Sequence, residues 1–226
     1  MIRNIFFDMG NTLVHRPLDR QVGFAILLRR LGHGVSDEDV LAAYERARKQ
    51  VPHLQPYRQT AENLNQRLRS KIETTIQILG LPDPRALADR LLESDFNPIQ
   101  PFEDTIPALE EARSRGFRLG IISNWDPDLA DFTRRIGIDG YFDSVIASRA
   151  LGHRKPNPEI FAAALASMDA SARESVHVGD SVGSDAIGAM GMGIQPVVID
   201  REGRHNHLFC PVISSLLDIC AAVESL

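Results

Sequence analysis

Two aspartates that lie far apart in the sequence each follow an apolar segment of the kind that forms a buried strand. Asp8 comes after Ile5-Phe6-Phe7, and Asp180 comes after Val176-His177-Val178-Gly179. Open α/β sheets bind ligands at the carboxyl ends of their strands, so the two carboxylates are expected to converge there. Their like charges would favour a divalent cation between them, and Mg²⁺ is the usual choice where the substrate carries phosphate.

Further polar residues follow the same pattern. Ser123 and Asn124 come after Leu119-Gly120-Ile121-Ile122, and their hydroxyl and amide groups are suitable donors to a phosphate oxygen. The same residue types are common in ordinary turns, so this segment alone does not identify a site. Asp185 lies five residues after Asp180, where we expect it to orient a lysine or a metal-bound water.

Lys155 lies in a restrained segment of the chain. Pro156 disfavours helical backbone at Lys155, and Pro158 does the same at Asn157. Asn157 is then a suitable N-cap for a helix whose first position is Pro158. A lysine held in extended form just before a helix cap suits a point-charge contact with phosphate, and the alternative is an incidental lysine at a helix start.

In their order and separations, these segments resemble the haloacid dehalogenase superfamily over nearly the whole chain. Asp8 and Thr12 match the ends of the superfamily pattern Asp-x-Asp-x-Thr, and Gly179, Asp180 and Asp185 match Gly-Asp-x-x-x-x-Asp. The serine after the second strand corresponds to Ser123, and the lysine before a helix corresponds to Lys155. Ser-Asn-Trp-Asp at 123–126 is similar to one branch of the capped hydrolases in this superfamily.

The resemblance implies a Mg²⁺-dependent phosphatase that acts on a small phosphorylated metabolite, such as a sugar or acyl phosphate. Asp8 would attack phosphorus and form an aspartyl-phosphate that water then hydrolyses. The expected catalytic residues are Asp8, Ser123, Lys155 and Asp185; the expected substrate-binding residues are Ser123, Asn124 and Lys155; and the expected Mg²⁺ ligands are Asp8, Asp180 and the backbone carbonyl of Gly10.

Gly10 stands where the phosphatases of the superfamily carry a second aspartate, which protonates the leaving group and activates water. General acid–base catalysis contributes about 10²–10⁴-fold, so the loss should affect the rate. Three explanations are open: a substrate with a good leaving group, a substitute acid such as His15, or a protein that binds phosphates without cleaving them. Some capped sugar-phosphate phosphatases of the superfamily also have Gly-Asn at this place, so glycine alone does not imply inactivity. We favour the first explanation.

Two other enzymatic activities within the superfamily are also possible. A 2-haloacid dehalogenase would use Asp8 to attack carbon and would need no metal, but such enzymes usually carry an aromatic residue at the position of Gly10. A phosphonate hydrolase would have a small residue there and a lysine in its cap, and nothing in the spacing selects Lys49 or Lys71 for that role. The sequence does not identify the substrate.

The order of the expected elements predicts the architecture. From about residue 100 onward, strand-like segments alternate with helices of about ten residues, which indicates a parallel sheet with right-handed crossovers. We therefore predict a Rossmann-like three-layer α/β core formed by residues 1–15 and 100–226. Residues 16–99 read instead as four consecutive helices, which predicts an all-helical cap domain inserted after the first strand.

The composition excludes several other classes of protein. The 226 residues carry 25 basic and 30 acidic side chains, a formal charge of −5, which argues against a general nucleic-acid binder. Cys210 and Cys220 fit neither a zinc motif nor a disulfide framework. The first residues show no signal-peptide pattern and no apolar run is long enough to cross a membrane, so we expect a cytoplasmic protein. The oligomeric state cannot be predicted from these patterns.

Overall fold

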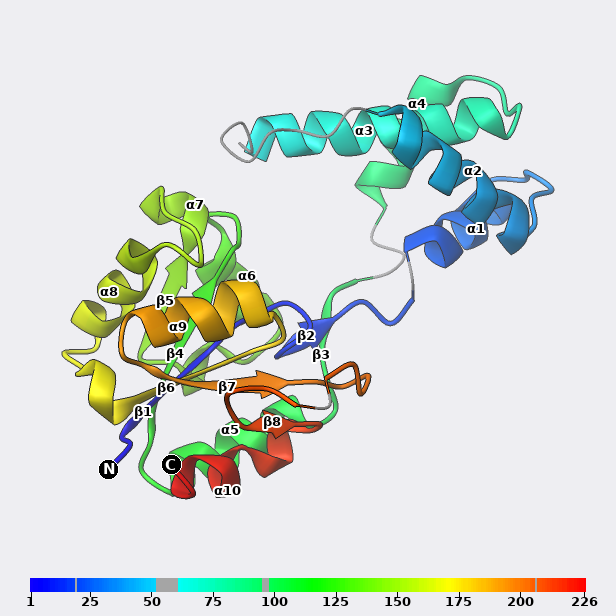
Figure 1. Cartoon of the computed structure of the whole chain (residues 1–226). Coiled ribbons are helices and arrows are strands. Elements are labelled where there is room, and N and C mark those ends of the chain that lie inside the picture. The colour runs from blue at the N-terminus through cyan, green and yellow to red at the C-terminus, as the bar shows by residue number, and fades with distance from the viewer. Residues whose placement is uncertain (19, 52–60, 95–97, 206) are drawn as a thin grey trace. The chain divides into compact units, whose positions relative to one another are not determined.

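The structure is a computed structural model that describes residues 1–18, 20–51, 61–94, 98–205 and 207–226. The chain divides into two compact units, which Figure 1 shows coloured along the sequence. One unit consists of Met1–His15 and Gln100–Leu226, and the other consists of Arg16–Ile99. The polypeptide therefore leaves the first unit after His15 and returns to it at Gln100.

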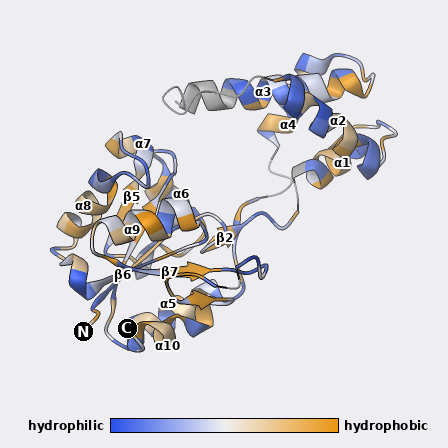
Figure 2. Ribbon diagram, viewed as in Figure 1, coloured by the Kyte–Doolittle hydropathy of each residue, from blue (hydrophilic) through white to orange (hydrophobic). Residues whose placement is uncertain are grey.

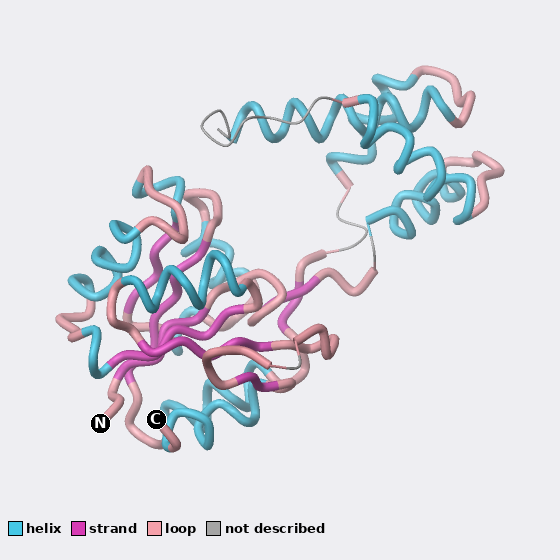
Figure 3. Tube along the Cα trace, in the orientation of Figure 1, coloured by secondary structure: helices cyan, strands magenta, loops and turns pink. Residues whose placement is uncertain are grey.

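A six-stranded parallel sheet forms the centre of the first unit, in the order β5-β4-β1-β6-β7-β8 (Figure 3). Its strands are β1 (Asn4–Phe7), β4 (Arg118–Ser123), β5 (Ser144–Ala147), β6 (Ser175–Gly179), β7 (Gln195–Ile199) and β8 (Val212–Ile213). Phe7 of β1 pairs with Ile121 on one side and Val178 on the other. These strands are apolar along most of their length, as expected of a parallel sheet that is buried on both faces.

Helices cover both faces of this sheet. Figure 1 shows α5 (Thr105–Ser114) and α10 (Ile219–Glu224) on one face, and α8 (Pro158–Ser167) and α9 (Ile187–Gly191) on the other. Apolar residues run along β7 between these layers (Figure 2). One core cluster joins β1 and β4 to α8 and α9; it comprises Phe6, Ile122, Ile160, Phe161, Ala164, Met168, Ala189 and Ile194. This arrangement confirms the predicted three-layer α/β fold with a parallel sheet.

A short antiparallel pair lies where the chain leaves and re-enters the first unit. It consists of β2 (Val14–His15) and β3 (Gln100–Pro101), with Val14 opposite Pro101 and His15 opposite Gln100. The carbonyl of Leu13, just before β2, accepts hydrogen bonds from the Phe102 amide (3.1 Å) and the Thr105 hydroxyl (2.6 Å). The outgoing and returning segments are therefore held together within the first unit.

The second unit is helical in its described part, with α1 (Arg20–Arg30), α2 (Asp37–Gln50), α3 (Ala61–Ile78) and α4 (Pro84–Glu93). Its own core cluster comprises Phe24, Ala25, Leu27, Leu28, Val40, Tyr44, Ile72, Ile76, Leu87, Ala88 and Leu91. Ser36 caps α2 by accepting a hydrogen bond from the Asp39 amide (3.0 Å). None of the helices in the described ranges combines the length and the apolar character needed to cross a membrane.

Several short elements differ from the sequence-based expectations. The β2–β3 pair and the strand β8 were not predicted, because segments of two residues give no periodic pattern. The short helix α9 (Ile187–Gly191) is preceded by a π-helical turn, Val182–Ala186. Asn157 does occupy the N-cap position of α8, but its side chain makes no capping hydrogen bond.

Candidate active site

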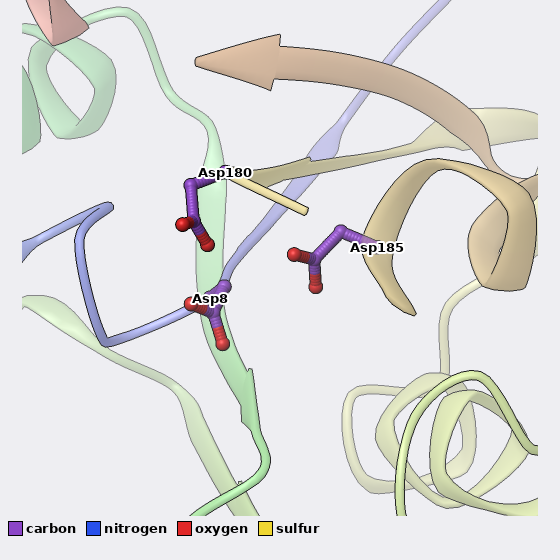
Figure 4. A group of neighbouring side chains, drawn as sticks. All are labelled: Asp8, Asp180 and Asp185. Carbon is purple, nitrogen blue, oxygen red and sulfur yellow. The ribbon is translucent and has the colours of Figure 1, made fainter. Parts of the chain in front are cut away.

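Three neighbouring strands bring the predicted residues to one edge of the sheet. Asp8 follows β1, Ser123 ends β4 and Asp180 follows β6, with β1 between the other two strands. The Asp8 amide extends the pairing by donating to the carbonyl of Val178 at 2.8 Å. The carboxylates of Asp8, Asp180 and Asp185 converge (Figure 4), and one oxygen from each lies within 4.8 Å of the others.

The Lys155 ammonium lies between two of these carboxylates. Its nitrogen Nζ is 2.6 Å from Oδ1 of Asp8 and 2.6 Å from Oδ1 of Asp185, and it also donates to the Ile122 carbonyl at 2.6 Å. The Ser123 hydroxyl donates to the same Asp8 oxygen at 3.1 Å. Only 1% of the Lys155 side chain is exposed, and a buried ammonium is tolerated only with such charged and polar partners.

Asn124 holds the backbone that carries Lys155. The side-chain amide of Asn124 donates to the Lys155 carbonyl at 3.1 Å and accepts from the Lys155 amide at 2.8 Å. These two hydrogen bonds join the segment after β4 to the segment before α8. The predicted contact of Asn124 with substrate stays a prediction, and the contact that the structure gives its side chain is with Lys155.

Asp185 is engaged through both of its oxygens. Oδ1 contacts Lys155 and lies 3.0 Å from Nε2 of His177, while Oδ2 accepts a hydrogen bond from the Ser181 amide at 3.0 Å. A Cβ atom at Gly179 would overlap the Asp185 carboxyl group, so this close approach requires glycine. With its oxygens occupied in this way, Asp185 is a poorer candidate for a metal ligand than Asp8 or Asp180.

The loop after β1 supplies a further polar group near Asp180. Asn11 adopts a left-handed backbone (φ 56°), which asparagine tolerates, and its amide donates to Oδ2 of Asp180 at 3.3 Å. Both contacts of Asp8 with Ser123 and Lys155 involve Oδ1, which leaves Oδ2 for another ligand. Carboxylate and carbonyl oxygens are the donors that Mg²⁺ prefers, so this set of residues fits the ion.

The electrostatics of the site favour the binding of a cation. Burial raises the pKa of Asp8, and burial together with the charge of Asp8 raises the pKa of Asp180. Burial opposes ionisation of Asp185 too, but Lys155 and His177 outweigh it and hold its pKa well below the usual range. Burial would lower the pKa of Lys155, and the charges of Asp8 and Asp185 raise it instead. A cation beside Asp8 and Asp180 would favour their ionised forms.

His15, the expected substitute acid, lies on β2 away from these hydrogen bonds. Its ring stacks on Phe102 with centroids 4.1 Å apart and an angle of 8° between the planes. The guanidinium group of Arg201 lies over the Phe102 ring, 3.7 Å from its centroid. Among the described residues, no hydrogen bond or ion pair links His15 to Asp8, so its role in proton transfer stays a prediction.

Two polar residues of this region were not predicted from the sequence. His177 lies in β6 and contacts Asp185. A histidine between two valines of a buried strand is the sequence feature that could have indicated its role. Arg201 donates to the carbonyl of Thr12 at 2.9 Å and to both carboxylate oxygens of Asp104 at 2.8 and 2.9 Å. Arg201 thereby anchors the loop that follows Asp8, and nothing in the local sequence marks it for that role.

The fold and these side chains define an α/β protein with a carboxylate- and lysine-containing site at the carboxyl edge of its sheet. A model of the haloacid dehalogenase-like hydrolases matches residues 2–193. The chain belongs to that family. This confirms the resemblance seen in the sequence motifs and identifies the protein as a hydrolase.

Individual relatives match over most of the chain. Haloacid dehalogenase-like hydrolase domain-containing protein 3 of Mus musculus is 30% identical over 207 residues, which cover 88% of this chain and 82% of the mouse protein. The glyceraldehyde 3-phosphate phosphatase of Methanothermobacter thermautotrophicus is 28% identical over 212 residues, covering 89% and 87% of the two chains. A HAD phosphatase of Thermococcus onnurineus has a similar fold, with a TM-score of 0.63 and 23% identity over 97% of both chains.

Proposed function

We propose that this protein is a Mg²⁺-dependent phosphatase that hydrolyses a small phosphorylated sugar through a phospho-aspartate on Asp8. The observation that carries the proposal is the contact of Lys155 with both Asp8 and Asp185, beside Ser123 at the carboxyl edge of the sheet. The similarity to a glyceraldehyde 3-phosphate phosphatase supports a small sugar as the molecule that carries the phosphate, whatever its point of attachment. A screen of sugar, nucleotide, acyl and glycolate phosphates would test it.

The chemistry proceeds in two displacements at phosphorus. A carboxylate oxygen of Asp8 forms a bond to phosphorus while the ester P–O bond breaks, and the electron pair of that bond leaves with the substrate oxygen. Water then attacks the same phosphorus, the bond from phosphorus to Asp8 breaks, and inorganic phosphate and the free carboxylate result. Lys155 and Ser123 donate to the phosphoryl oxygens, on which the negative charge is spread in the transition state.

The proposed Mg²⁺ ligands are Asp8, Asp180 and the backbone carbonyl of Gly10. When bound, the ion would supply positive charge that neutralises the phosphoryl group and brings it close to Asp8. Asp185 acts indirectly in this proposal, because its oxygens contact Lys155, His177 and the Ser181 amide. Removal of the ion by a chelator should abolish phosphate release, and added Mg²⁺ should restore it.

Because Gly10 has no acidic side chain, the proposed substrate should have a leaving group that needs no protonation. A leaving group that departs without protonation, such as an acyl or anomeric phosphate, would be cleaved well by this site. An ordinary alkyl ester would be cleaved slowly, because general acid catalysis typically contributes about 10²–10⁴-fold. The phosphate-release screen should therefore rank activated phosphates above unactivated ones.

We also propose that Arg16–Ile99 acts as a cap domain. The unit is inserted after the first strand of the sheet, which is where members of the superfamily with helical caps carry theirs. In this proposal its closure excludes bulk water during the reaction and its side chains select the substrate.

The decisive variant is Asp8→Asn, measured with Mg²⁺ on the best substrate of the screen. We expect phosphate release to fall by at least about 10³-fold, because the amide cannot serve as the nucleophile. Wild-type turnover in Asp8→Asn would refute the proposal. Activity on a 2-chloro acid that survives a chelator would identify a dehalogenase, and Asp8-dependent phosphate binding without release would identify a non-catalytic binding protein.

A further inference from the structure

His177 is a polar side chain in the interior of β6. It lies between Val176 and Val178, is 0% exposed, and contacts the ring of Phe161 edge to face with centroids 5.4 Å apart. An imidazole among apolar side chains is unfavourable unless it forms a hydrogen bond. What the residue does therefore depends on the partner that it has there.

That partner belongs to the candidate active site. Nε2 of His177 is 3.0 Å from Oδ1 of Asp185, and the same oxygen is 2.6 Å from Nζ of Lys155. Lys155 is in turn 2.6 Å from Oδ1 of Asp8. An unbroken series of polar contacts thus runs from the interior of the sheet to the proposed nucleophile.

The chemistry of the contact fixes the direction of the hydrogen bond. Burial lowers the pKa of His177 and keeps the imidazole neutral, so the ring carries a single N–H. The Asp185 carboxylate can only accept, and the proton is therefore on Nε2. Nδ1 has no hydrogen-bond partner within the described part of the chain, as expected for the nitrogen without a proton. His177 directs its one donor at Asp185.

We propose that His177 is a positioning residue that holds the Asp185 carboxylate in the orientation that aims Lys155 at Asp8. This inference rests on the proposed function, in which Lys155 neutralises the transferring phosphoryl group. The Ser181 amide holds the second oxygen of Asp185, so His177 completes the restraint from the other side. Without the contact from His177, Lys155 is the one partner of Asp185 Oδ1 among the described residues, and the carboxylate can rotate.

Three substitutions at one position test the inference. In His177→Gln the side-chain nitrogen can take the place of Nε2, whereas His177→Asn carries the same amide one carbon too short and His177→Leu carries no donor. We expect kcat for phosphate release to fall about 10–100-fold in the leucine and asparagine variants, with little change in KM. His177→Gln should recover most of the loss.

Val176→Ala is the matched control for stability, because Val176 is buried in the same strand and points to its other face. We expect this control to lower the unfolding temperature without lowering kcat per folded molecule. If His177→Leu also keeps the wild-type kcat, or if His177→Gln recovers no more than His177→Asn, His177 is merely a core residue and the inference is wrong.

Binding of beryllofluoride with Mg²⁺, followed by ¹⁹F NMR, separates this inference from the proposed function. Beryllofluoride mimics a phosphoryl group on an aspartate, so Asp8→Asn should abolish its binding. Wild-type protein that binds beryllofluoride but releases no phosphate would refute the proposed hydrolysis. In that case the affinity for beryllofluoride should still be highest in the wild type, lower in His177→Gln, and lowest in His177→Asn and His177→Leu. Equal affinities in all four would refute the positioning role, and wild-type protein that neither binds nor turns over would refute both.

Discussion

Gly10 is the residue at which this chain departs from the motif of the phosphatases in its family. A Cβ atom at this position would meet nothing within 4 Å, and its backbone is outside the left-handed region. The Cβ atom of an introduced aspartate therefore meets no steric conflict. The position is open to a direct test of what the missing carboxyl group contributes to the reaction.

We predict that Gly10→Asp raises kcat on substrates with poor leaving groups by up to about 10²-fold, because the new carboxyl group can protonate the departing oxygen. Activated acyl or anomeric phosphates should gain little. The measurement is a comparison of kcat across a series of leaving groups. Gly10→Asn is the matched control, since it has the same size without the acid, and an equal gain in that variant would show that protonation is not the cause.

The motif residues could be predicted from the sequence, whereas the residues that support them could not. Asp8, Ser123 and Asp180 follow or end strands that a parallel sheet must bring to one edge, so their convergence follows from the topology. His177 is eight residues from Asp185, and Arg201 is 97 residues from Asp104. Contacts of this kind depend on side-chain geometry in the folded protein, which no periodicity in the sequence reports.

Secondary structure could likewise be predicted from the sequence for the long regular elements and not for the short ones. The long alternating segments, such as β4 and α8, were predicted because their apolar patterns extend over several residues. The pair β2–β3 depends instead on pairing between segments separated by the whole helical insertion. Local propensity in a two-residue strand is too weak to indicate it.

A cluster of polar contacts ties α5 to the loop after β1 and to the end of β7. Asp104, which precedes α5, accepts hydrogen bonds from Arg201, from the Ser215 hydroxyl (2.8 Å) and from the Leu216 amide (2.9 Å). Burial alone would raise the pKa of Asp104, but the hydrogen bonds from Arg201, Leu216 and Ser215 outweigh it and lower the pKa. The ionised carboxylate is therefore favoured by folding.

We predict that Asp104→Asn lowers the free energy of unfolding at neutral pH by about 1.5–3 kcal/mol, the usual contribution of hydrogen bonds to a charged group. Because the folded pKa is depressed, the contribution of Asp104 is complete above its unfolded pKa of about 4 and is lost as the pH falls through the folded pKa. Urea denaturation between pH 7 and pH 2 should show the gap between wild type and variant closing on the acid side.

Asp131→Asn is the control for this experiment. Asp131 pairs with Arg134 on the surface, where both side chains are 67% exposed, and such pairs contribute at most about 1 kcal/mol. Its variant should follow the wild-type curve closely. A gap for Asp104→Asn that stays constant down to pH 2 would show that the ionised carboxylate is not what stabilises the folded state.

At the scale of the whole molecule, each compact unit has its own apolar core. Ile76 is fully buried in the cluster of the helical unit, and Phe6 is fully buried in a separate cluster between the sheet and its helices. Units with separate cores can open independently of one another. A change in one cluster should then affect the amide protection of its own elements.

We predict that Ile76→Ala destabilises the helical unit by about 2–5 kcal/mol through the cavity it leaves. Hydrogen exchange followed by mass spectrometry should show faster exchange in α2, α3 and α4, with exchange in β1, β4 and β6 unchanged. Ile122→Ala, in the core cluster of the sheet, should give the reverse pattern. If either variant accelerates exchange equally throughout the chain, the two units unfold as one.

The antiparallel pairing of His15 with Gln100 brings the first and last residues of the helical insertion to adjacent positions. The segment from Arg16 to Ile99 thus connects two paired antiparallel strands, as the turn of a β-hairpin does, and this connection does not depend on the length or the sequence of the segment. Exchanging this segment for another helical bundle, or for a tight two-residue turn, should leave the strand order and the register of β1 unchanged. In the proposed division of roles, the inserted unit selects the substrate and the first unit carries out the reaction, so substrate preference and catalytic chemistry can diversify separately in evolution.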